Sequence, residues 1–487
     1  MNSGFSALDW GVFGAYFFVL ALSSYLFSRE KITSSREYFT SSNQMPLFGV
    51  ALSILATSQS AATFLGVPEF SYAHNFTFIG FYFSALLAVF FIARVFVPKF
   101  YEYKVITVYE LLEHRYGTSA KKQAGIMFLV GRIMASGARL YIGALAISMI
   151  LFLDISFVHM FLSILILVFG ALIYTYFGGV KSVILSDGIQ AITYVGAGII
   201  VLFYLYTSLG DVNVVDVLQE NNKLTFFDTS FDGKFNIIGL LSGWLLLNIA
   251  AFGLDQDMTQ RVLSCKNKEE ASSSLILSIV MTIPVVLLFL AIGALLFVHY
   301  QSVNITQSFS GEKITVFMYY ILHELPEGIR AIVTVGAIAA ALSSTNSVLG
   351  AMASVAIEDI YKPYKLQHEP QTSEAYFVKQ SKKAVLFFAF TLILMAMVSY
   401  FWQKYSDVSL ISFALGIMAF AYTGLLGVFF SALFTSRGNS KTVPFALAGG
   451  FLTVLSLQPY TFGISIGFSW QIVLGTFVAF LIMQSKK

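Results

Sequence analysis

The stretch that decides the fold is TVGAIAAALSSTNSVLGAMASVAIED, residues 334–359, a membrane-length apolar run with a cluster of short polar side chains. Ser343 and Ser347 stand four residues apart, and Asn346 is three beyond Ser343. At these spacings their oxygens share one side of a helix. Uncharged oxygen ligands in a dry site suit a small monovalent cation such as sodium. The alternative is that small residues here only allow close helix packing.

The composition places the whole chain in a membrane. Of its 487 residues, 57% are hydrophobic and 11% are charged, and the mean hydropathy is +0.77. The single cysteine excludes disulfides and thiolate metal sites as organising features. Because no Walker sequence, HExxH motif or cysteine pair occurs, we expect no ATPase subunit, no transition metal and no enzyme activity. The net charge of +3 does not indicate a nucleic-acid partner.

Apolar runs long enough to span a bilayer recur along the chain. The sequence therefore predicts an all-α integral membrane protein with about thirteen transmembrane helices. The predicted helices lie near 7–27, 46–71, 77–98, 123–152, 156–176, 180–208, 236–256, 271–299, 331–359, 383–403, 407–433, 442–459 and 467–484.

The basic residues predict the orientation of these helices. Most of the 29 Lys and Arg residues fall in alternate loops and at the C-terminus. Among them are Arg29, Lys31, Lys486 and Lys487. The positive-inside rule places these segments in the cytoplasm and the N-terminus outside, in a plasma (inner) membrane.

This orientation allows an internal repeat. The second and seventh helices run in opposite directions, so 46–208 and 236–433 can form two five-helix units of inverted orientation, as in many secondary transporters. The segment 7–27 is then an extra N-terminal helix, and 442–484 holds two C-terminal helices, all within one transporter domain.

The second predicted helix carries an unusual polar run, TSQSAAT, from Thr57 to Thr63, followed by Pro68. Such a helix could unwind near its middle, which would free carbonyls such as those of Ala56 and Gln59 to bind a cation while hydroxyls face a solute. Tight helix packing, with Pro68 marking the helix end, is the alternative.

Ionisable and amide side chains inside other spans are candidates for function, because they are unfavourable in hydrocarbon. Arg132 and Arg139 lie seven residues apart on one face of the fourth helix. They could form structural ion pairs, with Glu69 or Asp187, or hold an anionic substrate. Asp187 could ligate a cation or form a salt bridge, and Asn248 could bond a neighbouring helix or a solute.

The end of the seventh predicted helix reads GLDQDMTQR, residues 253–261. Its side chains Asp255, Gln256, Asp257 and Arg261 alternate acidic and polar groups before a basic one. We expect them to form a cytoplasmic charge cluster.

Five segments in order resemble the sodium/solute symporter family, which includes sodium/galactose, sodium/proline and sodium/sialic acid transporters. They are SREYFTSSNQMP, VITVYELLEHRYG, FGGVKSVILSDGIQ, GLDQDMTQRVLSCKN, and AALSSTNS followed by IEDIYKP. The resemblance covers most of the chain. It implies a LeuT-type fold, in which a 5+5 inverted repeat has one helix before it and two after it.

The resemblance also implies ligand sets. A general sodium site would use the carbonyls of Ala56, Gln59 and Ala340 and the hydroxyls of Ser343 and Ser344. A possible second sodium site would use Asp187, Ser343, Asn346 and Ser347, with Asn346 where the sialic acid transporter has serine. The solute would meet Ser58, Ser60, Thr63, Tyr82, Arg139 and Asn248, with the arginine on a carboxylate. Because Ser58, Thr63 and Tyr82 replace the Asn, Gln and Glu of the galactose transporter, a neutral-hexose site is doubtful.

We therefore expect a sodium-coupled secondary active symporter that imports a small polar organic solute by alternating access. The best candidate is an acidic sugar such as sialic acid, and sodium is the coupling ion, with no other cofactor. Its partners would be the solute, sodium and the lipid bilayer. Alternatives are a neutral sugar, an amino acid such as proline, or a monocarboxylate. A channel or a transport-like sensor is the alternative from another class.

Overall fold

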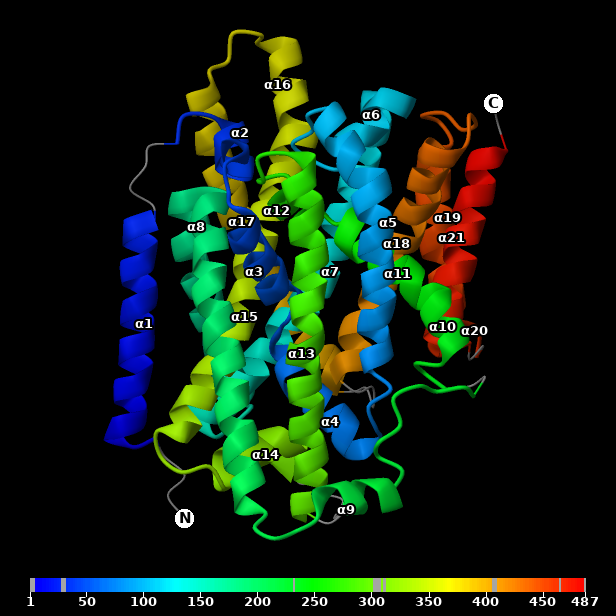
Figure 1. Cartoon of the computed structure of the whole chain (residues 1–487). Helices are drawn as coiled ribbons and strands as arrows, with labels where there is room; N and C mark the ends of the chain where they lie inside the picture. The colour runs from blue at the N-terminus through cyan, green and yellow to red at the C-terminus, as the bar shows by residue number, and fades with distance from the viewer. Residues whose placement is uncertain are drawn as a thin grey trace.

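The computed structural model of the chain is a bundle of roughly aligned helices (Figure 1). It describes residues 5–27, 32–230, 233–300, 308–309, 312–404, 410–463 and 466–485, so Arg29, Lys31, Lys486 and Lys487 lie outside the described residues. Within these ranges seven helices are long and apolar enough to cross a membrane, or up to nine if each of two bent pairs counts as one span. Helix α1 begins and helix α21 ends at opposite ends of the bundle (Figure 1).

The first half of the chain supplies helices α1 to α8. Their bounds are α1 Ala7–Phe27, α2 Ser35–Thr40, the 3-10 helix η1 Ser41–Asn43, α3 Leu47–Ser58, α4 Ala61–Ala73, α5 Ile79–Glu102, α6 Glu110–Tyr116, α7 Thr118–Phe152 and α8 Phe157–Ser208. At about 1.5 Å per residue the 52 residues of α8 would extend roughly 80 Å, more than twice the hydrocarbon core of a bilayer. The backbone of α8 leaves helical geometry at Gly179, between the two spans predicted at 156–176 and 180–208.

Both the backbone conformation and the surroundings of residue 179 require a glycine. Its φ of 58° and ψ of −154° lie where essentially only glycine is found. A Cβ at this position would lie 2.5 Å from the carbonyl oxygen of Tyr38. The sequence therefore needs glycine here to join the two halves of α8.

Gly179→Ala is expected to lower the midpoint of thermal denaturation in detergent, by an amount that reflects about 1–3 kcal/mol of backbone strain plus the contact with Tyr38. Gly188→Ala is the matched control, because a Cβ there meets no atom within 4 Å. In a helix interior alanine is favoured over glycine by about 0.5–1 kcal/mol, so the control should be neutral or stabilising. Equal midpoints for the two variants would contradict the assignment of a glycine-only junction.

The second half supplies the remaining elements. The helices are α9 Val214–Glu220, α10 Ile237–Leu241, α11 Gly243–Gly253, α12 Gln256–Val262, α13 Lys268–Tyr300, α14 Val316–His323, α15 Ile329–Ser354, the π-helix η2 Val355–Tyr361, α16 Lys362–His368, α17 Glu374–Lys404, α18 Leu410–Phe434, α19 Val443–Ser456, α20 Pro459–Phe462 and α21 Phe468–Gln484. The short strands β1 Ser308–Phe309 and β2 Glu312–Lys313 pair antiparallel. Each predicted span has a helical counterpart when α8 is counted as two.

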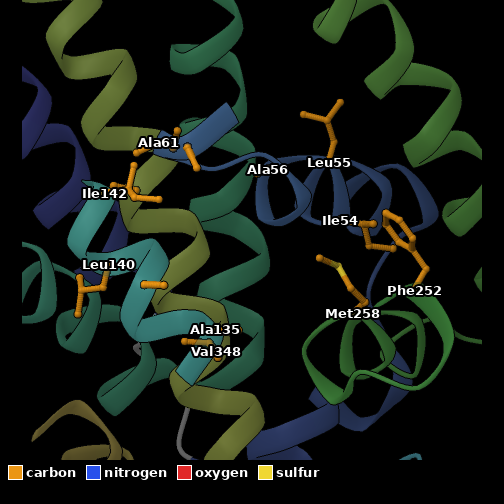
Figure 2. Close-up of a cluster of buried hydrophobic side chains, with 14 of the residues drawn as sticks. Ile54, Leu55, Ala56, Ala61, Ala135, Leu140, Ile142, Phe252, Met258 and Val348 are labelled. Carbon is orange, nitrogen blue, oxygen red and sulfur yellow. The ribbon is translucent and has the colours of Figure 1, made fainter. Parts of the chain in front are cut away.

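Two spans are broken, the first near its middle and the second closer to its C-terminal end. Helices α3 and α4 are bent by 62°, and α10–α11 and α12 by 57°. Figure 2 shows the first break, where the ribbon carrying Ile54 gives way to a non-helical link before Ala61. Ser60 and Thr63 start α4 as a capping box, and the side chain of Asp255 caps α12. The predicted unwinding of the second helix is confirmed, whereas the second break was not predicted.

Helix α15 lies inside the bundle. It packs against α1, α3, α4, α7, α8 and α17. In its most apolar window 89% of the residues are buried, against 33% for α1 at the periphery. The polar side chains of the stretch quoted first therefore face protein, not lipid.

Candidate functional site

A cavity beside the break between α3 and α4 collects every side chain predicted for the solute. Its empty volume is about 780 Å³, open solvent included. The predicted residues that line it are Ser58, Ser60, Thr63, Tyr82, Arg139 and Asn248. They come from α3, α4, α5, α7 and α11 and from the link between α3 and α4. The structure thus brings the six together, while their role in solute binding stays a prediction.

Asn248 leaves an acceptor available in the cavity wall. It is fully buried, and its Nδ2 donates to the carbonyl oxygen of Phe81 at 3.2 Å. Its Oδ1 has no hydrogen-bond partner among the described residues. Since a buried acceptor without a partner costs about 1–3 kcal/mol, a solute hydroxyl would satisfy it.

Tyr82 joins the cavity to the helix break. Its hydroxyl accepts a hydrogen bond from Gln59 Nε2 at 3.3 Å. Gln59 Oε1 in turn accepts from the hydroxyl of Tyr194 at 3.4 Å. Gln59, at the break, therefore contacts both the cavity wall on α5 and the second half of α8.

Besides apolar residues, three further charged or hydroxyl side chains line the cavity without having been predicted for the solute: Arg132, Asp255 and Tyr422. Arg132 could have been included, because its seven-residue spacing from Arg139 places both on one face of α7. Tyr422 lies in an apolar span, and nothing in the sequence separates it from other membrane tyrosines. Asp255 enters the wall only because the chain bends between α11 and α12.

An ionic network of five charged side chains runs from this cavity into the bundle. Arg132 Nη1 donates to Asp255 Oδ2 at 2.9 Å, and Arg132 Nη2 donates to Asp257 Oδ2. Arg261 Nη1 donates to Asp257 Oδ1 at 2.9 Å, and Arg261 Nη2 donates to Asp187 Oδ2 at 3.0 Å. Each of the five residues is at most 4% exposed.

The network corrects two expectations. Arg132 pairs with Asp255 and Asp257 rather than with Glu69 or Asp187, and the cation beside Asp187 is Arg261. The segment 255–261 is buried rather than a cytoplasmic charge cluster. The reason is the 57° bend before α12, which turns this segment into the protein interior.

Asp187 joins three helices at one carboxylate. From α3, the hydroxyls of Ser53 and Thr57 donate to Oδ2 at 2.5 and 3.5 Å. From α15, Ser343 Oγ donates to Oδ1 at 2.7 Å. The middle of α3, the second half of α8 and the polar stretch of α15 therefore meet around a single acidic group.

The predicted general sodium site lies where these helices meet. Ala56 adjoins Thr57, and the hydrogen-bond ladder of α3 stops there, because the N–H of Ser60 bonds to Thr63 Oγ1 at 3.4 Å. Ser344 Oγ donates to the carbonyl oxygen of Ala340 at 3.3 Å on its own helix. The break thus leaves the carbonyl of Ala56 outside the α3 ladder, and α15, which carries the other three predicted ligands, packs against both α3 and α4.

The possible second sodium site is only partly assembled. Asp187 and Ser343 are hydrogen-bonded, but Ser347 Oγ donates to the carbonyl oxygen of Ser344 at 3.1 Å. Asn346 is fully buried, and neither of its amide atoms has a hydrogen-bond partner within the described part of the chain. The guanidinium of Arg261 stands at Asp187 on the side away from Ser343.

A helical membrane bundle in which two broken spans border a cavity with a few polar and charged side chains is the architecture of a secondary transporter. The chain belongs to the sodium:solute symporter family, whose model matches residues 38–452. It is accordingly a sodium-coupled symporter and not an enzyme.

Relatives and a solved structure agree with this placement. The sodium/sialic acid symporter NanT of Aliivibrio fischeri is 25% identical, over 95% of this chain and 89% of its own. The sodium/sialic acid symporter SiaT of Proteus mirabilis is 24% identical, over 97% and 93%. A Na+-coupled sialic acid symporter solved in a substrate-bound, outward-open state matches with a TM-score of 0.83 at 22% identity, covering 98% of this chain and 97% of that one. The likeness shows the LeuT-type fold.

Proposed function

We propose that the chain imports an acidic sugar, with sialic acid as the first candidate, together with sodium. The observation that carries this proposal is Arg139 in the wall of a cavity that also presents Ser58, Thr63 and Asn248. A guanidinium can hold a carboxylate through two parallel hydrogen bonds, whereas hydroxyl and amide groups match sugar hydroxyls. Two relatives named as sodium/sialic acid symporters support the choice.

Sodium would bind at Ala56, Gln59, Ala340, Ser343 and Ser344, and a second ion at Asp187, Ser343, Asn346 and Ser347. Its binding would favour the outward-open state and so raise solute affinity. The two five-helix units, 46–208 and 236–433, would move against each other, and each opens with one of the two broken spans.

We propose that the protein lies in the plasma (inner) membrane. Its N-terminus would be outside the cell and its C-terminus in the cytoplasm. The basic loops support it, as do the first and last helices, which begin and end at opposite ends of the bundle (Figure 1). An interior negative potential then drives sodium inward by about 2.3 kcal/mol per charge per 100 mV.

The test of the proposal is uptake of labelled sialic acid into proteoliposomes. Accumulation is expected under an inward sodium gradient and not under a matched potassium gradient. A thermal-shift screen of sialic acid, hexoses, proline and short acids, with and without sodium, identifies the solute, because a ligand stabilises the state that binds it. Stabilisation by a hexose or by proline and not by sialic acid would overturn the acidic-sugar assignment.

Ser343→Ala is expected to raise the sodium concentration for half-maximal uptake by about tenfold or more, since hydrogen bonds to charged groups contribute about 1.5–3 kcal/mol. Ser343 belongs to both predicted sodium sites and donates to Asp187. Ser354→Ala is the matched control, because that buried hydroxyl on the same helix donates to the carbonyl of Ala351 at 2.8 Å. If both variants keep the parent's sodium dependence, Ser343 is not a sodium ligand.

A further inference from the structure

An open groove lies between α7 and α17, away from the solute cavity. Its walls carry Ile126 and Val130 on α7 and Phe387 on α17, and its floor is Ala356 and Ile357 of η2. The empty volume is about 1100 Å³, open solvent included. Ile126, Val130 and Phe387 are 44%, 45% and 63% exposed. In a bundle that spans a membrane, such a surface faces acyl chains.

One end of the groove is polar and basic. Tyr361, Gln380 and Lys383 line this end, and Lys122 stands one turn before Ile126 on the same face of α7. The side chains of Lys122 and Lys383 are exposed. Among the described residues that line the groove none is acidic. The two carboxylates of η2, Glu358 and Asp359, are buried and contact Lys362 and Thr107.

The groove changes from basic to apolar with increasing depth in the membrane. Both α7 and α17 begin at the basic end, which is the predicted cytoplasmic side, and run toward the bilayer centre. At about 1.5 Å per residue, Ile133 lies roughly 16 Å deeper than Lys122, close to half of the hydrocarbon thickness. The groove therefore offers a cationic end at headgroup level and an apolar trough about one leaflet deep.

We propose that this groove is a binding site for one anionic phospholipid of the inner leaflet, with its phosphate on Lys122 and Lys383 and an acyl chain along the trough. An acyl chain gains little by moving from the surrounding lipid into the groove, because both environments are apolar. The charge of the headgroup therefore supplies the selectivity. Basic pockets between helices on the cytoplasmic side are suited to anionic headgroups.

The floor of the groove connects the site to the ion pathway. The segment η2 continues α15, the helix that carries Ser343 and Ser344. Helices α7 and α17 both pack against η2, and π-helical segments often occur at functional positions. A lipid in the groove would brace the cytoplasmic end of the helix that carries the predicted sodium ligands.

The test compares lipid binding by native mass spectrometry of the full chain, released from micelles that hold equal amounts of phosphatidylglycerol and phosphatidylcholine. Lys122→Gln with Lys383→Gln should lower the ratio of phosphatidylglycerol to phosphatidylcholine adducts about fivefold for each lysine removed. Ala384→Trp, which fills the groove without changing its charge, should lower the bound phosphatidylglycerol as well. Lys266→Gln with Lys441→Gln is the control, since both are exposed lysines in other loops of the same predicted side.

Two results would overturn the proposal. If the groove lysine pair and the control pair change the ratio equally, the preference reflects surface charge alone. If Ala384→Trp keeps the parent's phosphatidylglycerol binding, the headgroup is held without the groove. Neither readout depends on transport, so this site and the proposed solute are tested separately.

Discussion

Replacing Asp187 with asparagine is expected to abolish sodium-dependent uptake and to destabilise the protein by about 1–3 kcal/mol. The loss of stability follows because Arg261, 1% exposed, would lose the carboxylate that it contacts at 3.0 Å and would keep only that of Asp257, at 2.9 Å. The loss of sodium dependence follows because Asp187 carries the only formal charge in the predicted second sodium site. Thermal denaturation and uptake into proteoliposomes measure the two effects.

The double variant Asp187→Asn with Arg261→Met separates them. Removing both partners of a buried ion pair is often neutral for stability, and Asp257 keeps its contact with Arg132. We expect the double variant to regain most of the parent's thermal stability and still to lack sodium-dependent uptake. If it regains both, Asp187 serves only to hold Arg261.

Arg139→Gln is expected to lower the affinity for sialic acid about 10- to 100-fold, since hydrogen bonds to charged groups contribute about 1.5–3 kcal/mol. Glutamine keeps a donor in the cavity wall but removes the charge and the fork geometry that match a carboxylate. Sodium-dependent thermal shifts or isothermal titration measure the affinity.

The carboxyl amide of sialic acid supplies the sharper comparison. The parent should bind the acid more tightly than the amide, and Arg139→Gln should bind the two alike. Arg94→Gln, on the exposed face of α5, should behave as the parent does. A variant at Arg139 that still prefers the acid would show that another group holds the carboxylate.

The spans could be predicted because a bilayer sets the length of an apolar run. The break after Ser58 could also be predicted, since the run from Thr57 to Thr63 places polar groups in the middle of a membrane helix. The junction at Gly179 fell between two predicted spans. In each case the physical cause lies within the segment itself.

The partners of buried charges could not be predicted in the same way. Arg132 and Asp257 are 125 residues apart, and their contact depends on the bend that turns α12 into the bundle. The residues at this bend do carry a local signal, because Asp255 is a favoured helix N-cap. It was missed because Asp255 lies at the end of the predicted span 236–256, where a charged residue is expected at the membrane surface.

Arg132 and Asp255 belong both to the cavity wall and to the ionic network. This limits the ways in which such a chain can change its solute over evolution. Substitutions at Ser58, Thr63 or Tyr82 alter the wall without removing a member of the ionic network. A substitution at Asp255 also leaves Arg132 with one carboxylate fewer and disturbs the chain of charges that reaches Asp187. New specificities in this architecture should therefore arise at Arg139 and on the side formed by α3, α4 and α5, while Arg132 and Asp255 stay constant.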